Sequence, residues 1–497
     1  MNHKKIYISA LFTLLLVGCR QGQTTSKPPV SSEPPIVTSS EEPTSFIPGE
    51  RKGTRKLEFF GINDFHGSII ESDSEPGIFK IASYLKSRYA TNVGGTLFLN
   101  AGDYWQGSAD SNINRGAFLT RAMNELSLDA MTLGNHEFDW FDTAIMNNKA
   151  LANYPFLGAN ILKKDTNELA TNLVHYDPSF QASTIVTKND VRVGIVGTIG
   201  PHLESSILAT AVAPYTFEPV ESYIQNEVTN LREKGADVIA LVVHDSLAGA
   251  VGSYTNILND KLVDLVFSGH AHTEDNQMYN GIPILQTNGN GKQIMEVEAT
   301  YNFDLQSFTV NETNIVEGSY IKGAFTEDVA TRTLFGEYEA QINSVKNEVV
   351  GTLTSSISKN GLANLANKMM YEYAVGEGYP NVVAVHNTGG VRVYSIPAGE
   401  VTYGDIYKAF PFDNEVMLIE NVLGSTLKGY ISFHPSYPLS QQAIVDQDLY
   451  TVVTIDYVSF GKYSNLANVP QIHSGEYVRE LIAQHFRDYR EVDGASY

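Results

Sequence analysis

Residues that commonly bind metals recur in five short motifs of this sequence, all between residues 64 and 272. The motifs combine carboxylate, imidazole and amide side chains: Asp64-Phe65-His66, Gly102-Asp103, Gly134-Asn135-His136-Glu137-Phe138-Asp139, Val243-His244 and Gly269-His270-Ala271-His272. Such mixed ligands suit Zn, Mn, Fe or similar first-row ions, whereas Ca prefers shells made of oxygen alone. The sequence therefore predicts a site for divalent first-row metals.

One carboxylate in this set, that of Asp103, has two oxygens and can bridge two ions. A pair of ions roughly 3.5 to 4 Å apart can clamp the attacking and leaving oxygens of an in-line displacement at phosphorus. The pKa of water bound to such an ion falls from about 15.7 to about 7, so hydroxide is available near neutral pH. The motifs therefore predict a two-metal phosphoester hydrolase.

The third motif also contains a His-Asp pair, because Asp139 follows His136 by three residues. If a helix begins at Asn135, this spacing puts the two side chains one turn apart. Asp139 has a second interpretation, that of a carboxylate at a helix N-terminus stabilised by the helix dipole. The two interpretations are compatible.

Apolar runs precede four of the five motifs and predict buried strands that end in polar residues. These runs cover residues 57–62, 96–100, 237–242 and 262–267. Strands that alternate with helical stretches predict a layered α/β sheet, in which ligands gather outside the carboxyl ends of the strands. The period of two along a strand is expected to put Asp64 and His66 on one side, and likewise His270 and His272.

Composition limits the class of protein. The chain has 497 residues, of which 42% are hydrophobic, enough for two to four packed domains. Its formal net charge is −22, and so strongly acidic a protein repels polyanions. Binding of DNA or RNA is therefore not expected as its main function.

The first 19 residues predict an export signal, with Lys4 and Lys5 followed by an apolar run to Val17 that is too short to span a membrane. Cys19, the only cysteine, follows a small residue as in bacterial lipoprotein signals, so we expect an extracytoplasmic protein anchored to the cell membrane through acylated Cys19. An ordinary secretory signal is the alternative. Residues 20–52 are rich in Ser, Thr, Pro and Glu and predict a disordered tether.

The rest of the chain divides into two predicted domains joined by a helix. The first spans 53–320, and a helix over 326–349 carries Leu334, Tyr338, Ile342, Val345 and Val349 on one stripe. A smaller α/β domain spans 350–497. It contains Asn387-Thr388-Gly389-Gly390-Val391-Arg392, Tyr403-Gly404-Asp405 and Phe410-Pro411-Phe412, which by themselves indicate a Gly-rich turn and an exposed aromatic residue.

From about residue 55 to 465 these motifs, in this order, resemble the calcineurin-like metallophosphoesterases, specifically the bacterial 5'-nucleotidase and cyclic phosphodiesterase family. The resemblance implies an α/β fold with a four-layer sandwich domain, a connecting helix and a smaller substrate-binding domain. It implies a monomeric enzyme that removes phosphate from a small phosphorylated substrate, a nucleotide, with activity on cyclic nucleotides or nucleotide sugars as close variants.

The resemblance also assigns roles to residues. One metal site would hold Asp64, His66, Asp103 and His272, and the other Asp103, Asn135, His244 and His270. His136 would stabilise or protonate the departing oxygen, and Asp139 would fix its tautomer. In the second domain the substrate-binding residues would be Asn387, which contacts the base, Gly390 in the turn, Arg392, which grips phosphate, and Phe412 and Tyr457, which stack on the base.

Two departures from the family pattern affect the substrate. Family members with a second Arg place it just before Gly-Asn-Leu, where this chain has Gly361-Leu362-Ala363-Asn364-Leu365. The family's Gly-Gly-Asp-Gly sequence after the second aromatic is replaced here by a stretch that includes Gly461-Lys462. The alternative function is therefore a diverged surface lipoprotein that binds or hydrolyses a non-nucleotide phosphoester.

Overall fold

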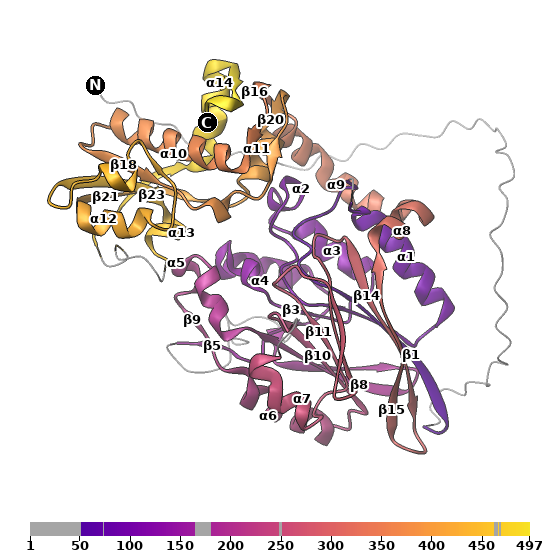
Figure 1. The fold of residues 1–497 in the computed structure, drawn as a ribbon. Helices are drawn as coiled ribbons and strands as arrows, with labels where there is room; N and C mark the ends of the chain where they lie inside the picture. Colours follow the sequence, from indigo (N-terminus) through magenta and orange to yellow (C-terminus); the bar gives the residue numbers. More distant parts are fainter. Residues whose placement is uncertain (1–50, 73, 165–179, 248–250, 462–465, 467–468) are drawn as a thin grey trace, which may run out of the picture. The chain divides into compact units, whose positions relative to one another are not determined.

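The computed structural model describes residues 51–72, 74–164, 180–247, 251–461, 466 and 469–497 (Figure 1). The predicted signal peptide, Cys19 and all but the last two residues of the predicted tether lie outside this range. No helix within the described ranges is long and apolar enough to cross a membrane.

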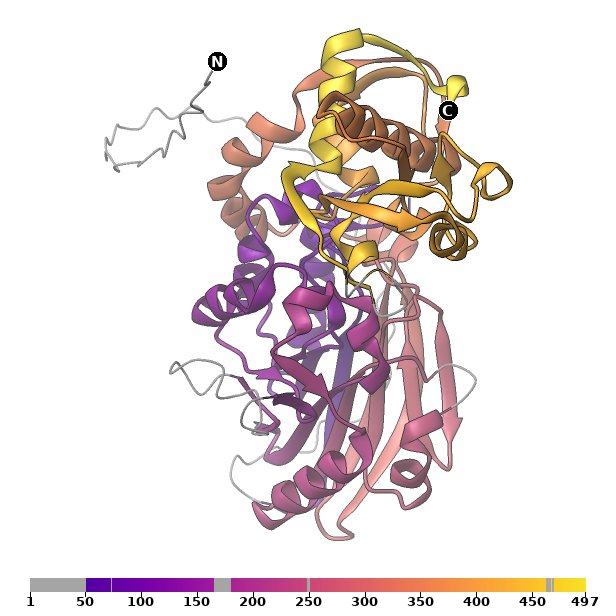
Figure 2. The same cartoon turned by 90° about the vertical axis from the view of Figure 1, so that its left-hand side faces the viewer.

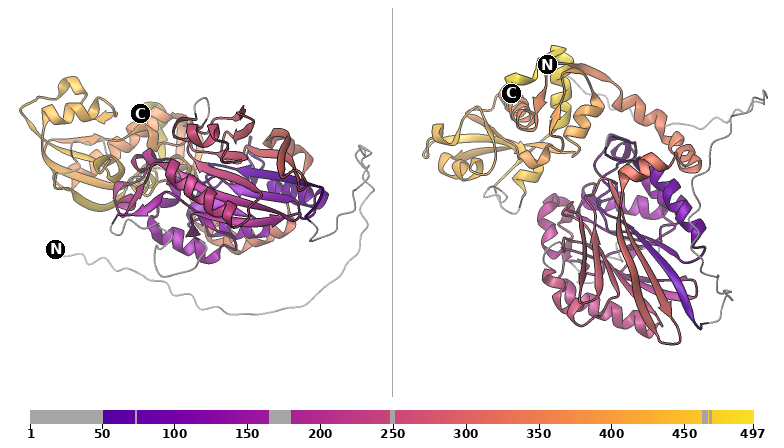
Figure 3. Two further views of the ribbon diagram at one scale, coloured as in Figure 1. Left: turned by 90° about the horizontal axis from the view of Figure 1, so that it is seen from below. Right: turned by 45° about the vertical axis from the view of Figure 1, so that its right-hand side comes forward.

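Two sheets form the first part of the described chain. The seven-stranded sheet has the spatial order β15 (Ser307–Glu317), β14 (Gln293–Asn302), β1 (Thr54–Ile62), β2 (Thr96–Asn100), β3 (Ala130–Thr132), β4 (Phe156–Leu157) and β6 (Phe180–Gln181). The six-stranded sheet has the order β12 (Asp275–Tyr279), β13 (Ile282–Gln286), β11 (Leu265–Ser268), β10 (Val238–His244), β8 (Val191–Ile199) and β7 (Ser183–Lys188). Figure 3 shows indigo β1 beside the long hairpin of β14 and β15, with which it continues the sheet.

Strand β1 shows why the central strands are apolar on both sides. Leu57 and Phe59 join the core between the two sheets, while Phe60 and Ile62 join the core beneath the helices. Because successive side chains of a strand point to opposite faces, a strand covered on both faces needs a continuous apolar run. The runs that predicted buried strands are thus explained by two separate cores.

Helices cover the outer face of each sheet. Residues of α1 (Gly77–Thr91), α3 (Ala117–Glu125) and α4 (Phe141–Leu151) pack in the core of the seven-stranded sheet. Residues of α6 (Val220–Glu233) and α7 (Thr255–Asn259) pack on the six-stranded sheet, and Figure 2 shows magenta α6 outside the strands. Helix, sheet, sheet and helix make four layers, so the predicted sandwich is confirmed.

Short elements complete this part of the chain. They are α2 (Ala109–Asn112), η1 (Asn135–Phe138), β5 (Ile161–Lys163), η3 (Pro201–Ser206), α5 (Ala209–Val212), β9 (Tyr215–Phe217) and η4 (Gly252–Tyr254).

Two helices follow the last strand, α8 (Gly318–Ala324) and α9 (Val329–Lys346). The predicted stripe of the connecting helix is observed for Leu334, Tyr338, Ile342 and Val345, which pack against the cores. Val349 departs from the prediction: it begins strand β16, pairs with Thr402 and is 48% exposed. The helix ends at Lys346, with Asn347 as its cap, because the chain then becomes extended and pairs as β16 with β20.

The C-terminal part has its own core and two larger sheets. One has the order β20 (Gly399–Thr402), β16 (Val349–Ser355) and β25 (Glu491–Asp493), and the other β22 (Ser436–Tyr437), β18 (Val382–Val385), β23 (Leu449–Ile455), β21 (Glu415–Leu423) and β24 (Ile472–Tyr477). Its main helices are α10 (Lys359–Gly376), α11 (Tyr403–Ala409), α12 (Gly424–Ile431), α13 (Asp456–Ser459) and α14 (Val478–Tyr489). Smaller elements are β17 (Ile357–Ser358), η5 (Thr388–Gly390), β19 (Ser395–Ile396), η6 (Gln441–Ala443) and η7 (Gly494–Ser496).

Parallel pairing brings the predicted motifs to one edge. Strands β1, β2 and β3 are parallel neighbours in one sheet, and β10 and β11 are parallel neighbours in the other. The carboxyl ends of parallel neighbours meet at the same edge of a sheet. Four of the motifs lie in the segments that follow β1, β2, β3 and β11, and the fifth, Val243-His244, ends β10 itself.

Candidate active site

The predicted ligands lie just beyond the strand ends, except His244, which is the last residue of β10. Strand β1 ends at Ile62 and β11 at Ser268, so the expectation that strand periodicity aligns each pair of ligands is wrong. The aligning feature is a left-handed backbone at the ligand positions: φ is +48° at Asp64, +47° at His66, +75° at His270 and +50° at His272. Asp103 shares this conformation, with φ of +53°.

The surrounding backbone holds these unusual conformations in place. The N–H of Asp64 donates to the carbonyl of Gly102 at 2.9 Å, and that of His66 to the carbonyl of Asp103 at 3.1 Å. A non-glycine residue in this region costs on the order of 1–3 kcal/mol, which the rest of the fold must offset. Such conformations persist where the surrounding structure holds them, and they are common at active sites.

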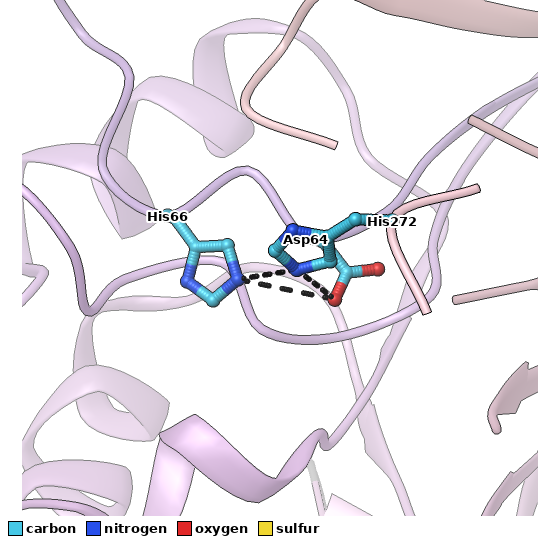
Figure 4. Close-up of side chains that lie close together, drawn as sticks. All are labelled: Asp64, His66 and His272. Atoms are coloured by element: carbon cyan, nitrogen blue, oxygen red, sulfur yellow. Dashed lines mark hydrogen bonds and ion pairs between the residues drawn. The ribbon is translucent and has the colours of Figure 1, made fainter. Parts of the chain in front are cut away.

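One group of ligands consists of Asp64, His66 and His272, which converge in Figure 4. The Nε2 atoms of the two histidines lie 3.0 Å apart. Oδ1 of Asp64 lies 3.1 Å from Nε2 of His272 and 3.9 Å from Nε2 of His66. Three electron-pair donors therefore face one point.

A second group consists of Asp103, His244, His270 and Asn135. Nε2 of His244 lies 3.2 Å from Oδ2 of Asp103 and 3.1 Å from Oδ1 of Asn135. Nδ1 of His270 lies 3.1 Å from the same amide oxygen. Oδ2 of Asp103 is also 4.0 Å from Nε2 of His66, so this carboxylate stands between the two groups.

Hydrogen bonds behind the rings fix which nitrogen faces the site. The Nδ1–H of His66 donates to the carbonyl of Gln106 at 2.8 Å, and that of His244 donates to the carbonyl of Ala101 at 2.7 Å. Each ring therefore turns its Nε2 toward the site. Burial lowers the pKa of His244, but the charge of Asp103 outweighs it and raises the pKa to about 10, so this position favours positive charge. Burial lowers the pKa of His66 to about 3 and that of His270 to about 4, which keeps both rings neutral.

The donor set fits two divalent metal ions. Asp64 is fully buried and Asp103 is 1% exposed, and two ionised carboxylates at such depth require positive charge nearby. The ligands are imidazole, carboxylate and amide, the combination expected for Zn, Mn and related ions. Asp103 stands between the two groups and has two carboxylate oxygens, so it would be the ligand that both ions share.

His136 and Asp139 form a hydrogen-bonded pair at the mouth of the site. Nδ1 of His136 lies 2.7 Å from Oδ2 of Asp139, and its Nε2 lies 4.0 Å from Oδ2 of Asp103. Asp139 caps the end of η1 and not its beginning, so its partner here is the imidazole. Burial lowers the pKa of His136, but the charges of Asp139 and Asp103 outweigh it and raise the pKa above its ordinary value.

Glu137 was quoted in the third motif but given no role by sequence reasoning. Its carboxylate accepts backbone N–H bonds from Asp103, Tyr104 and Gly134, each at 2.8 Å, and the residue is fully buried. Glu137 therefore ties the loop that carries Asp103 to the loop that carries Asn135. The only signal in the sequence was the position of Glu137 inside the third motif, between His136 and Phe138.

A cavity of about 480 Å³ lies over these groups. Its lining residues come from the metallophosphoesterase part of the chain and from the C-terminal part. All five predicted substrate-binding residues line it: Asn387, Gly390, Arg392, Phe412 and Tyr457. The ring of Phe412 stacks on that of His136, with centroids 5.7 Å apart and planes inclined by 29°. The guanidinium carbon of Arg392 lies 5.7 Å from the centroid of Phe412.

Asn414 and Asp456 also line the cavity, and neither was predicted as a site residue from the sequence. Oδ1 of the predicted residue Asn387 is buried without a hydrogen-bond partner. Burial raises the pKa of Asp456 to about 7. Lys462 of the altered loop lies outside the described residues. Leu362, at the position of the family's second Arg, is 1% exposed and packs in the C-terminal core, so it offers nothing to the cavity.

Comparison with known proteins gives two matching families. The model described as calcineurin-like phosphoesterase matches residues 57–274, and the one described as 5'-nucleotidase, C-terminal domain, matches residues 341–441. Together the two matches cover more than half of the chain. They follow one another in the order that the motifs predicted.

Three relatives have similar sequences. Endonuclease YhcR of Bacillus subtilis is 24% identical over 426 residues, which are 77% of this chain and 34% of that protein, so the chain spans about a third of its length. A 5'-nucleotidase of Vibrio vulnificus is 24% identical over 446 residues, covering 78% of this chain and 77% of that protein. Cell wall protein Lmo0130 of Listeria monocytogenes is 22% identical over 436 residues, covering 74% and 54%.

Among solved structures, a 5'-nucleotidase precursor from Thermus thermophilus aligns with a TM-score of 0.70 at 20% identity, over 88% of this chain and 97% of that one. This likeness shows the fold, and the two family matches show the descent. Both agree with the ligand groups described above, and the chain belongs to the calcineurin-like metallophosphoesterases that carry a 5'-nucleotidase C-terminal domain, a family of metal-dependent phosphoester hydrolases.

Proposed function

We propose that this enzyme removes the phosphate group from nucleoside monophosphates. The observation that carries the proposal is the cavity itself. Asp103 and His136 of the metallophosphoesterase part line it together with Arg392, Phe412 and Tyr457 of the C-terminal part. Groups suited to phosphoester hydrolysis and aromatic rings therefore face the same space. A nucleotide, which joins a phosphate to a flat base, matches that combination.

Each residue would have one task in this reaction. Asp64, His66, Asp103, Asn135, His244, His270 and His272 would hold two divalent ions, which supply the Lewis acidity that makes water nucleophilic near neutral pH. As the water oxygen bonds to phosphorus and the ester P–O bond breaks, His136 would donate a proton to the departing nucleoside oxygen. Asp139, bonded to Nδ1 of His136, would keep the proton-donating nitrogen directed at that oxygen.

The C-terminal residues would recognise the substrate. The Arg392 guanidinium can bind a phosphate through two parallel hydrogen bonds. Phe412 and Tyr457 would stack on the base, and the unpartnered Oδ1 of Asn387 could accept a hydrogen bond from it. Gly390 is buried beside Asn387, where a β-carbon would come within 3.0 Å of that oxygen, so the turn would need a glycine there.

A second candidate is hydrolysis or binding of a non-nucleotide phosphoester. It is favoured by the replacement of the family's second Arg by buried Leu362 and by the altered sequence around Gly461. A panel of AMP, UMP, cyclic nucleotides, UDP-glucose, NAD, sugar phosphates and a small aryl phosphate separates the two. Preference for a sugar phosphate over every nucleotide would establish this second candidate.

The proposal is tested with variants of the aromatic residues and of Arg392. Replacing Phe412 or Tyr457 with Ala should cost about 1–3 kcal/mol for a nucleoside monophosphate, the range for one base-aromatic stack, and much less for an aryl phosphate. Arg392→Ala should weaken all phosphorylated substrates, since a guanidinium reads the phosphate and not the base. Equal losses on AMP and the aryl phosphate in the aromatic variants would refute base stacking.

The role of metals has its own test. Excess chelator should abolish hydrolysis, Mn, Zn or Co should restore it, and Asp103→Ala should lose both sites because Asp103 stands between them. Full turnover by metal-free enzyme in excess chelator would contradict the two-metal proposal.

We further propose the predicted organisation of the whole chain. It consists of an export signal (1–19), a tether (20–52), a metallophosphoesterase domain (53–320), a linker helix (326–349) and a substrate-binding domain (350–497). Acylation of Cys19 would hold a monomeric, extracytoplasmic enzyme at the cell membrane. The apolar run before Cys19 supports this location.

A further inference from the structure

The loop that carries Phe412 is bonded on both sides by charged and polar groups from distant parts of the chain. Phe412 lies between α11 and β21, and Asp413 directly follows it. Oδ2 of Asp413 accepts a hydrogen bond from Nη1 of Arg115 at 2.6 Å, and its Oδ1 accepts one from Nη2 of Arg479 at 2.7 Å. Each carboxylate oxygen therefore has its own guanidinium.

Arg479 also holds the main chain of this loop. It lies on α14 and is 7% exposed, and its Nη1 donates to the carbonyls of Phe410 at 3.1 Å and Phe412 at 3.2 Å. Its guanidinium carbon lies 3.8 Å from the ring centroid of Tyr407. A buried arginine with this many acceptors is rigid, so the backbone on either side of the Phe412 ring is fixed.

The metallophosphoesterase part of the chain completes the attachment. Nδ2 of Asn112 donates to the carbonyl of Pro411 at 3.0 Å, and Oδ1 of Asn112 accepts from the N–H of Gly107 at 2.9 Å. Arg115 follows in the same segment, and its guanidinium carbon lies 5.0 Å from the ring of Trp140, which lines the cavity. Gly107 packs against the proposed ligand His66, since a β-carbon at Gly107 would lie 2.3 Å from the His66 carbonyl oxygen, so Asn112 connects the loop with Phe412 to the candidate metal site.

We propose that Arg115 and Arg479, acting through Asp413, are positioning residues that hold the Phe412 ring where the substrate's base stacks. The inference rests on the proposed function, because it gives the ring a substrate only if that substrate is a nucleotide. Arg115 fixes the loop from the metallophosphoesterase side and Arg479 from the substrate-binding side. Losing Arg115 should misplace the ring without altering the metal ligands, since Arg115 contacts none of them in the described structure.

The test compares AMP with p-nitrophenyl phosphate as substrates for the metal-loaded full chain. Arg115→Ala and Asp413→Ala should each raise KM for AMP roughly tenfold. This is less than the loss of a whole base-aromatic stack can cost, which is up to about 3 kcal/mol. The kcat/KM for p-nitrophenyl phosphate should stay within about twofold, because that substrate makes no base stack. Arg115→Lys should restore part of the AMP affinity, since lysine keeps the charge but not the planar donor fork.

Two further variants make the result specific. The double variant Arg115→Ala with Asp413→Ala should be no worse than Asp413→Ala alone, because Arg115 acts through the Asp413 carboxylate, which Asp413→Ala already removes. The matched control is Arg121→Ala, whose Nη1 bonds Oε2 of Glu337 at the same 2.6 Å but which does not line the cavity, and AMP kinetics should not change. Asp413→Ala leaves the buried Arg479 without its carboxylate partner and risks unfolding. The side chain of Arg115 is half exposed, so the comparison of Arg115→Ala with the wild type is the decisive one.

The outcomes separate this inference from the proposed function. If Phe412→Ala loses AMP selectivity but Arg115→Ala does not, the positioning role is wrong and the nucleotidase proposal stands. Equal losses on AMP and p-nitrophenyl phosphate in Arg115→Ala would also overturn it, because they indicate general damage to the structure. If Phe412→Ala leaves the ratio of kcat/KM for AMP to kcat/KM for p-nitrophenyl phosphate unchanged, Phe412 does not stack on the base, and both base stacking and this inference are wrong.

Discussion

At the scale of single residues, the candidate site depends on side chains that are each oriented by a specific partner. The imidazole of His66 is fixed by the Gln106 carbonyl and that of His244 by the Ala101 carbonyl. His136 differs, because its Nδ1 is held by a carboxylate and its Nε2 lies 4.0 Å from Oδ2 of Asp103. The charges of Asp139 and Asp103 outweigh the effect of burial and raise the pKa of His136, so this ring is suited to carry and donate a proton.

His136→Ala should therefore lower kcat by about 10² to 10⁴, the usual contribution of general acid catalysis, with little change in KM. Steady-state kinetics on AMP measure both constants. The control is His473→Ala: Nδ1 of His473 also bonds a carboxylate, 2.8 Å from Oε2 of Glu415, but His473 does not line the cavity. A large rise in KM at unchanged kcat would mean that His136 binds substrate and does not transfer the proton.

Glu137→Ala should destabilise the fold itself. It leaves three buried N–H groups, those of Asp103, Tyr104 and Gly134, without an acceptor, which should lower the free energy of unfolding by about 3 kcal/mol or more. Urea unfolding in excess chelator measures this loss separately from metal binding. Glu125→Ala, at the exposed end of α3, should stay within about 0.5 kcal/mol. A similar small change for Glu137→Ala would show that water replaces the carboxylate.

At the scale of elements, the site is built where five strands stop. Because β1, β2 and β3 are parallel neighbours, their following loops lie side by side, and glycines allow them to approach closely. A β-carbon on Gly134 would lie 2.3 Å from Oδ1 of Asp103 and 2.6 Å from its backbone nitrogen. The φ of Gly134 is −98°, which any residue can adopt, so the need for glycine there is purely steric.

Gly134→Ala should accordingly displace the Asp103 carboxylate. A misplacement of about 1 Å typically costs about 10² in rate, and the same is expected for kcat/KM here, together with weaker metal binding measured by titration of the apo protein. Gly336→Ala on α9 is the control, because nothing lies within 4 Å of its β-carbon and alanine favours the helix. Unchanged activity in Gly134→Ala would show that the two loops move apart freely.

Much of this arrangement was predictable from the sequence because it is local. Apolar runs predicted β1, β2, β10 and β11, and the polar residues that follow them predicted the site. The left-handed backbone at Asp64 and His66 was not predictable, because neither residue type requires it and the hydrogen bonds that hold it come from the loop after β2. The same holds for Asp413, whose partner Arg115 is 298 residues away and leaves no local pattern.

At the scale of the whole molecule, the negative charge of the protein opposes the binding of the proposed substrate, which is itself an anion. The chain has 56 Asp and Glu against 34 Lys and Arg. Among the described residues that line the cavity, Arg392 is the only Arg or Lys, while Asp103, Asp139, Asp413 and Asp456 are acidic. Two divalent ions would reverse the sign of the potential at the phosphate end, so the proposed metals matter for substrate attraction as well as for chemistry.

The location of the enzyme is the remaining prediction for the molecule as a whole. Cys19→Ala should leave the precursor without an acyl chain and move the enzyme from the membrane fraction to the soluble fraction, because acylation is its proposed anchor. Cys19 is the only cysteine, so the substitution removes no disulfide and no thiolate ligand, and kcat on AMP should be unchanged. Fractionation of cells fed a labelled fatty acid measures anchoring, and the kinetics of the released protein serve as its control. Wild-type enzyme in the membrane fraction without a labelled chain would show that something other than Cys19 holds it there, and wild-type enzyme in the soluble fraction would favour an ordinary secretory signal.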